Sequence, residues 1–218
     1  MSLWIKICAN TSLEDAMLAA EAGADAVGFV FAPSPRRVTP EQAARMVPGL
    51  PERLEKIGVF VDSPLEEVVS TVRVSGLTGV QLHAGYAPDA TERLRREFGP
   101  GLRILRVVHF GPDAAQLASA FAADASVDAV LVDSRTAIAV GGTGVAFDWA
   151  AASRTVFANG SARLIAAGGL SPGNVAEAIA TLRPWGVDVA SGVESAPGRK
   201  DPVKVKAFLA NARAAIRG

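Results

Sequence analysis

The sequence predicts an α/β fold, a single-domain (β/α)8 barrel with eight parallel strands that spans residues 1–218. Two observations predict this fold. Short apolar runs recur along the chain, and segments with helical spacing and helix-start residues lie between them. Eight such units repeat at a mean spacing of roughly 27 residues, which suits a compact TIM barrel. No proline- or serine-rich linker divides the chain, so we expect one domain.

The eight apolar runs are rich in Val, Ile, Leu and Phe and do not simply alternate with polar residues. Continuous runs of this kind are typical of parallel strands that are buried on both faces. In chain order they read LWIKICA, ADAVGFVFA, EKIGVFVD, TGVQLHA, LRILRVVHF, VDAVLVDS, RLIAAGG and GVDVASG.

A residue that favours the start of a helix follows each run. These start signals are Ser12, Thr39-Pro40, Ser63-Pro64, Pro88, Pro112, Asp148, Ser171-Pro172 and Asp201-Pro202. The alternative fold is an open doubly wound sheet, whose first turn is usually rich in glycine. Here the first turn reads CANTSLED and contains no glycine, which favours the barrel.

Composition and charge exclude several classes of protein. Lys+Arg and Asp+Glu both number 22, so we expect no attraction to nucleic acid or to an anionic membrane. One cysteine excludes an intrachain disulfide, and two histidines disfavour a structural zinc site, so we expect no metal. No stretch of about 18 apolar residues and no export signal is present, and we expect a cytoplasmic protein.

Reactive residue types follow the predicted strands, at the end of a barrel where catalytic groups gather. Cys8 and Asp133 form the clearest pair. Side chains alternate along a strand, so Lys6 shares a face with Cys8, and Leu131 shares one with Asp133. If both faces point inward, thiol and carboxyl face each other across the mouth and can act as base and acid. The alternatives are that Cys8 is a small buried hydrophobe and that Asp133 caps the following loop.

The ends of the seventh and eighth runs predict a phosphate site. Gly168 and Gly169 lie in AAGGLSPGN, and Ser191 and Gly192 lie in SGVESAPGRKD. Exposed backbone amides near a helix N-terminus bind anions, and these two positions of a barrel frequently do so. We therefore expect a phosphorylated small molecule as the ligand. The alternative is that these glycines only form tight turns.

Other polar residues at this rim are candidates for binding the rest of the ligand. Arg36, in SPRRV, can bind a carboxylate, although loop arginines such as Arg36 and Arg37 are often solvated surface. Lys6 needs a partner inside the barrel, and Asp188 on the eighth strand is the nearest one, unless Asp188 holds sugar hydroxyls instead. Gln81 and His83 close the fourth strand. The loop GGTGVAFD, residues 141–148, reads as mobile over the mouth.

Five blocks of the sequence, in order, resemble the phosphoribosylanthranilate isomerase family of tryptophan biosynthesis. They are KICANTSLEDAMLAAEAGADAVGFVFAPSPRRV, GVQLHAG, VLVDS followed by GGTGVAFDW, IAAGGLSPGNVAEAI, and GVDVASGVESAPGRKDP. The resemblance covers essentially the whole chain. It implies a (β/α)8 barrel, no cofactor, and an Amadori rearrangement of N-(5-phosphoribosyl)anthranilate.

The resemblance also implies roles for residues that match the family's motifs. Cys8 would be the general base, Asp133 the general acid, and Arg36 the group that meets the anthranilate carboxylate. The phosphate would be held by Gly169, Ser191 and Gly192, and Asp188 would contact the sugar. From their places at the rim we also expect Gly168 to bind the phosphate and Gln81 and His83 to bind the substrate. Ala9 and Ala84 stand where the family commonly has glycine.

Two further functions remain open on the residues alone. One is a different phosphosugar isomerase or epimerase, and the other is a barrel that binds a phosphorylated metabolite without catalysis. The same phosphate site and acid-base pair would serve another isomerase, and Arg36 is the residue that distinguishes it. Monomer and homodimer are both compatible with the sequence.

Overall fold

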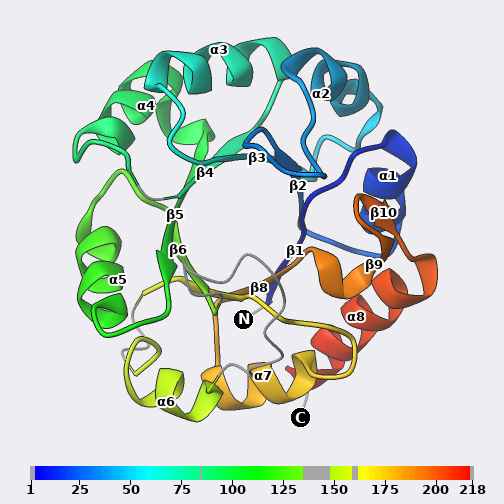
Figure 1. Cartoon of the computed structure of the whole chain (residues 1–218), viewed down its shortest axis with the longest axis vertical. Helices are drawn as coiled ribbons and strands as arrows, with labels where there is room; N and C mark the ends of the chain where they lie inside the picture. The colour runs from blue at the N-terminus through cyan, green and yellow to red at the C-terminus, as the bar shows by residue number, and fades with distance from the viewer. Residues whose placement is uncertain (1–2, 84, 135–147, 159–161, 217–218) are drawn as a thin grey trace.

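Eight parallel strands close into a barrel in the computed structural model of the chain, which describes residues 3–83, 85–134, 148–158 and 162–216 (Figure 1). Each strand pairs with the next, and the eighth pairs with the first, which confirms the predicted fold. The strands are β1 (Trp4–Ile7), β2 (Ala26–Val30), β3 (Glu55–Phe60), β4 (Gly79–Leu82), β5 (Arg103–His109), β6 (Ala129–Asp133), β7 (Leu164–Ala167) and β8 (Gly186–Val189).

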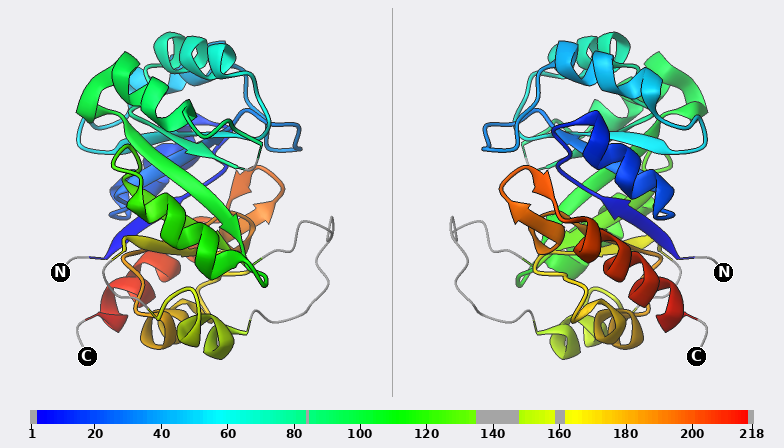
Figure 2. Two further views of the ribbon diagram at one scale, coloured as in Figure 1. Left: turned by 90° about the vertical axis from the view of Figure 1, so that its left-hand side faces the viewer. Right: turned by 90° about the vertical axis from the view of Figure 1, so that its right-hand side faces the viewer.

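Helices surround the barrel and cover its outer face (Figures 1 and 2). None of those in the described parts of the chain is long and apolar enough to cross a membrane. They are α1 (Leu13–Glu21), α2 (Pro40–Met46), α3 (Leu65–Ser75), α4 (Ala90–Phe98), α5 (Ala114–Ala123), α6 (Trp149–Arg154), α7 (Val175–Leu182) and α8 (Pro202–Ala215), with short 3-10 turns η1 (Val47–Gly49), η2 (Gly99–Gly101) and η3 (Ser191–Val193).

Several predicted helix starts are caps in the structure. The Ser12 hydroxyl accepts a hydrogen bond from the backbone N–H of Asp15, and Thr39 forms a reciprocal capping box with Gln42. The prediction for α7 was wrong by one turn. Asn174 is its N-cap residue, because the chain first makes a turn in which the Asn174 Oδ1 atom accepts the N–H of Ser171.

Apolar side chains fill two layers, as expected for strands that are buried on both faces. One layer lies between strands and helices and includes Ile5, Phe29 and Val80. The other fills the barrel itself, and it consists of Trp4, Ala26, Ile57, Leu105, Val107, Ala129, Leu131, Ile165 and Ala167. Inward-facing residues at the C-terminal ends of these strands therefore lie at the mouth of the barrel.

A small antiparallel hairpin lies between β8 and α8 and was not predicted (Figure 2). It consists of β9 (Glu194–Ala196) and β10 (Arg199–Lys200), joined by a turn at Pro197 and Gly198. The first and last residues of the hairpin, Glu194 and Lys200, are buried although both are charged. The hairpin therefore places two charged groups beside the end of the barrel that carries the candidate site.

Candidate active site

Cys8 directly follows β1 and is held by the sheet, because its backbone N–H donates to the Val189 carbonyl at 2.7 Å. Gly28 on β2 makes room for its side chain. A Cβ atom at Gly28 would lie 2.6 Å from Cys8 Sγ and 3.0 Å from Lys6 Cε. Both side chains therefore lie on the inner side of the barrel, as the alternation of residues predicts.

Asp133 is the last residue of β6 and shares the inner face of Leu131. In the sheet it lies opposite His109 of β5 and Ala167 of β7. A Cβ atom at Gly168 would lie 2.4 Å from Asp133 Oδ1, so only glycine fits beside this carboxyl group. The carboxyl group of Asp133 thus lies at the same rim of the barrel as the thiol of Cys8.

Lys6 of β1 lies inside the barrel and contacts both the neighbouring strand β8 and the more distant strand β4. Its Nζ atom donates to Asp188 Oδ1 on β8 and to Gln81 Oε1 on β4, both at 2.8 Å. The Gln81 Nε2 and His83 Nε2 atoms are 3.1 Å apart. The predicted ion pair between Lys6 and Asp188 is therefore present, and it continues as a polar chain toward His83.

The charges around Cys8 act in opposite directions on its pKa. Burial raises the pKa of the thiol, whereas Lys6 and Lys200 lower it, and burial dominates. Lys6 thus lowers the pKa of the thiol, but its effect is smaller than that of burial. Burial also disfavours the charge on Lys6, but Asp188 and Cys8 outweigh it and raise the pKa of Lys6.

Arg36 lies in the loop after β2 and binds a buried carboxylate. Its Nε atom donates to Oε1 and Oε2 of Glu194 at 2.9 and 3.0 Å, and Nη2 donates to Oε2 at 2.7 Å. The Glu194 side chain is only 4% exposed, whereas that of Arg36 is 23% exposed. Arg36 is therefore fixed at the rim, while the neighbouring Arg37 is exposed.

The loops after β7 and β8 pack against each other and expose backbone amides. A Cβ atom at Gly192 would lie 1.9 Å from the Leu170 carbonyl oxygen, so the two loops approach as closely as glycine allows. Within the described parts of the chain, no partner is found for the backbone N–H groups of Gly169, Ser191 and Gly192. Gly169 has a φ of +66° and open space where a side chain would stand.

Comparison with known proteins assigns the family. The family model for N-(5'phosphoribosyl)anthranilate (PRA) isomerase matches residues 5–211. The chain belongs to this family. A relative of that name from Geobacter sp. (strain M21) is 45% identical over 210 residues, which are 96% of this chain and 97% of the relative.

Solved structures of the family have the same fold. The phosphoribosyl anthranilate isomerase from Thermotoga maritima is 33% identical with a TM-score of 0.85, covering 97% of this chain and 99% of that one. A phosphoribosyl anthranilate isomerase in complex with reduced 1-(o-carboxyphenylamino)-1-deoxyribulose 5-phosphate is 32% identical with a TM-score of 0.82 and the same coverage.

Four residues of this rim were not predicted from the sequence to belong to the site: Gly28, His109, Glu194 and Lys200. Gly28 lies inside an apolar run, and nothing in the run marks its contact with Cys8. The rings of His83 and His109 have centroids 5.9 Å apart, a contact that the alternation of β5 could have indicated. The loop at residues 141–147, expected over the mouth, and Ala84 lie outside the described residues.

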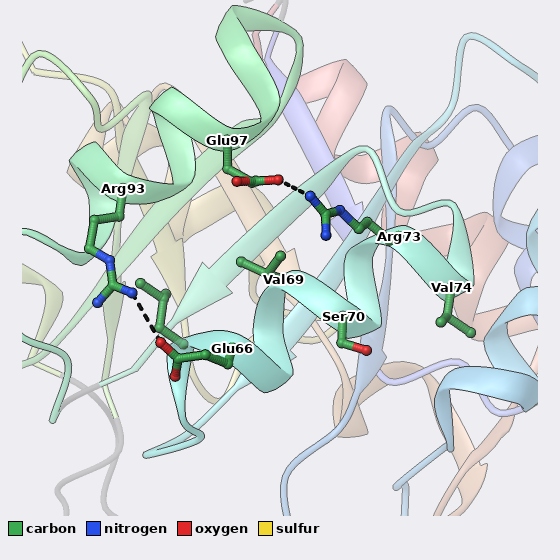
Figure 3. A pocket seen from close by; sticks show the side chains of 8 residues that line it. Glu66, Val69, Ser70, Arg73, Val74, Arg93 and Glu97 are labelled. Carbon is green, nitrogen blue, oxygen red and sulfur yellow. Dashed lines mark hydrogen bonds and ion pairs between the residues drawn. The ribbon is translucent and has the colours of Figure 1, made fainter.

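A groove of about 510 Å³ lies away from this rim, on the outer surface between α3 and α4 (Figure 3). Its charged lining residues pair across it. Arg93 Nη2 lies 3.0 Å from Glu66 Oε1, and Arg73 pairs with Glu97. The two ion pairs join the helices, so the groove is a helix-helix seam whose four charged lining residues are already paired with one another.

Proposed function

We propose that this chain catalyses the Amadori rearrangement of N-(5-phosphoribosyl)anthranilate to 1-(2-carboxyphenylamino)-1-deoxyribulose 5-phosphate, a step of tryptophan biosynthesis. One observation carries the proposal beyond family membership. Cys8 and Asp133, a base and an acid, lie on the inner side of one rim, and each faces a glycine that makes room for its side chain. A structure in the family binds a reduced form of this product, which supports the choice of substrate.

Asp133 is proposed as the general acid. It donates a proton to the ring oxygen of the furanose while the bond between that oxygen and C1 breaks. The nitrogen lone pair forms an iminium ion, which acidifies the proton on C2. Asp133 must carry a proton for this step.

Cys8 is proposed as the general base. Its thiolate takes the C2 proton, the electron pair of that C–H bond neutralises the iminium ion, and the resulting enaminol tautomerises to the aminoketone product. Because the iminium ion supplies the activation, we propose that the reaction needs no cofactor. Burial raises the pKa of Cys8, so a minor thiolate fraction carries the reaction near neutral pH.

The remaining site residues are proposed to bind the substrate. Arg36 meets the anthranilate carboxylate through charge-assisted hydrogen bonds. The phosphate binds at the backbone amides of Gly169, Ser191 and Gly192, with Gly168 shaping the turn. Asp188, Gln81 and His83 are proposed to orient the ribose, since they form the polar chain around Lys6.

For the organisation and location of the enzyme, we propose one domain over residues 1–218 and a place in the cytoplasm. All the proposed site residues come from one barrel, so a monomer suffices, and a homodimer is equally compatible. The family includes a dimeric phosphoribosylanthranilate isomerase, described for Thermotoga maritima.

A fluorescence assay tests the proposal. The purified chain is mixed with freshly formed N-(5-phosphoribosyl)anthranilate, and the fluorescence of the aromatic ring is followed together with the appearance of the product. We expect enzyme-dependent conversion that shows saturation. No change at high enzyme concentration would reject the isomerase, and conversion of phosphosugars without the aromatic ring would instead support a different isomerase or epimerase.

A further inference from the structure

The β9–β10 hairpin connects Arg36 to Cys8 through buried charged groups. Glu194 accepts three hydrogen bonds from Arg36 and lies 3.2 Å from the Nζ atom of Lys200. The same Nζ atom donates to the Cys8 carbonyl oxygen at 2.6 Å and to the Ala190 carbonyl oxygen at 3.3 Å. A continuous path of hydrogen bonds therefore joins the proposed carboxylate-binding residue to the backbone of the proposed base.

The guanidinium group of Arg36 has two edges that can bind a carboxylate. Glu194 occupies the edge formed by Nε and Nη2. The other edge is formed by Nη1 and Nη2, and Nη1 has no hydrogen-bond partner among the described residues. Glu194 thus fixes the plane of the guanidinium group and leaves one edge available to a second carboxylate.

This network has more cationic than anionic side chains, so its charge favours the binding of a second anion. One carboxylate, Glu194, is shared between two cations, Arg36 and Lys200. Lys200 has a side chain with no exposed surface, so its charge is not screened by water. Buried charges are stable when they are paired, and a ligand carboxylate at Arg36 would balance the set.

We propose that Glu194 is a positioning residue that holds the Arg36 guanidinium group for the aromatic carboxylate of the substrate. This inference rests on the proposed function. Glu194 does not touch the substrate; it fixes the rotamer of Arg36, so that the binding of a carboxylate requires no reordering of a long side chain. The affinity for a carboxylate-bearing ligand depends on Glu194, whereas the affinity for a ligand that lacks this group does not.

The test uses the variant Glu194→Gln and two probes, reduced 1-(2-carboxyphenylamino)-1-deoxyribulose 5-phosphate and the same compound without its carboxylate group. Binding is measured by calorimetry on the full chain. We expect Glu194→Gln to weaken binding of the first probe about tenfold, because Arg36 loses its charged anchor. Binding of the second probe stays unchanged. In the kinetic assay we expect KM to rise by a larger factor than the factor by which kcat falls.

Glu55→Gln is the matched control, because Glu55 also binds an arginine, Arg103, through two nitrogens. That pair lies at the opposite end of the barrel, and its loss should leave binding of both probes unchanged. In the background of Arg36→Ala, Glu194→Gln should cause no further loss of affinity for the first probe. Equal weakening of both probes, or an additive loss in the double variant, would overturn the proposal.

Glu194→Asp keeps the proposal testable if Glu194→Gln does not fold. Aspartate retains the charge that balances Lys200 but is too short to hold Arg36 in the same place. We expect a folded protein that again loses affinity only for the carboxylate-bearing probe, and unchanged affinity would contradict the inference. If the native chain binds neither probe, the proposed function fails instead, so the two failures are distinguishable.

Discussion

The two ends of the barrel contain the same kind of ion pair in different surroundings. At the N-terminal end of the strands Arg103 pairs with Glu55, Nη2 to Oε1 at 2.6 Å, and both side chains are 25% exposed. Arg103 also lies over the ring of Trp185, which stacks on Trp4 with centroids 5.4 Å apart. This end is closed by aromatic rings and by the cations that cover them.

At the C-terminal end the pair of Arg36 and Glu194 is more deeply buried and adjoins the backbone of Cys8. Here the polar side chains of Lys6, Gln81 and Asp188 converge on the inner side of the barrel. An ion pair of this kind therefore does not by itself define a functional site. Its position does: the pair of Arg36 and Glu194 lies at the rim that carries the proposed base Cys8 and the proposed acid Asp133, which agrees with the usual division of a barrel into a stability face and a catalytic face.

The largest effect should come from removing the acid or the base. Cys8→Ala and Asp133→Ala should each lower kcat by about 10²- to 10⁴-fold, since each removes one proton-transfer group. Steady-state kinetics and calorimetry with the reduced product analogue provide the measurement. Affinity for the analogue and the unfolding midpoint should change little. Turnover near the native value in either variant would remove that residue from the mechanism.

The second effect is on stability and depends on pH. Burial favours the neutral form of Glu194, but Arg36 and Lys200 outweigh burial and hold the pKa of Glu194 below its usual value. Ionised Glu194 therefore stabilises the fold above its unfolded pKa of about 4.3, and this contribution is lost as the pH falls through the lower folded pKa.

Glu194→Gln should accordingly lower the free energy of unfolding by about 3 kcal/mol at pH 7, because two cations lose their shared carboxylate. The difference from the native chain should shrink as the pH falls below about 4. Urea unfolding at both pH values measures it. At the other end, Glu55→Gln should cost at most about 1 kcal/mol, since that pair is partly exposed. Equal losses at both ends would contradict the comparison.

A third effect tests how closely the thiol is packed. Gly28→Ala should push Cys8 Sγ from its place, because the new methyl group would lie 2.6 Å from the sulfur. A displacement of this size should lower kcat about 10²-fold. Gly101→Ala is the control, because a Cβ at Gly101 meets nothing within 4 Å. Native turnover in Gly28→Ala would show that the sulfur does not need its present position.

The barrel was predictable because its strands are buried on both faces. Each strand therefore appears in the sequence as a nearly continuous apolar run. The inward direction of Cys8 and Asp133 could be predicted because side chains alternate along a strand, so that Cys8 shares a face with Lys6 and Asp133 shares one with Leu131. The partner of Arg36 was not predictable, because Glu194 is 158 positions further along the chain and belongs to a strand of three residues. A buried Lys200 also runs against the usual exposure of lysine, so no pattern in the sequence marks it.

The smallest of these effects separates the two arginines. Arg36→Ala should raise KM about 30-fold, equivalent to about 2 kcal/mol, because it removes the charged hydrogen bonds to the substrate carboxylate. Arg103→Ala removes the matching arginine at the closed end and one of the two guanidinium groups that lie over Trp185, so it should lower stability and leave KM unchanged. Steady-state kinetics and urea unfolding are measured for both variants. An unchanged KM in Arg36→Ala would mean that the anion is bound elsewhere on the rim, and a raised KM in Arg103→Ala would mean that the two ends do not act independently.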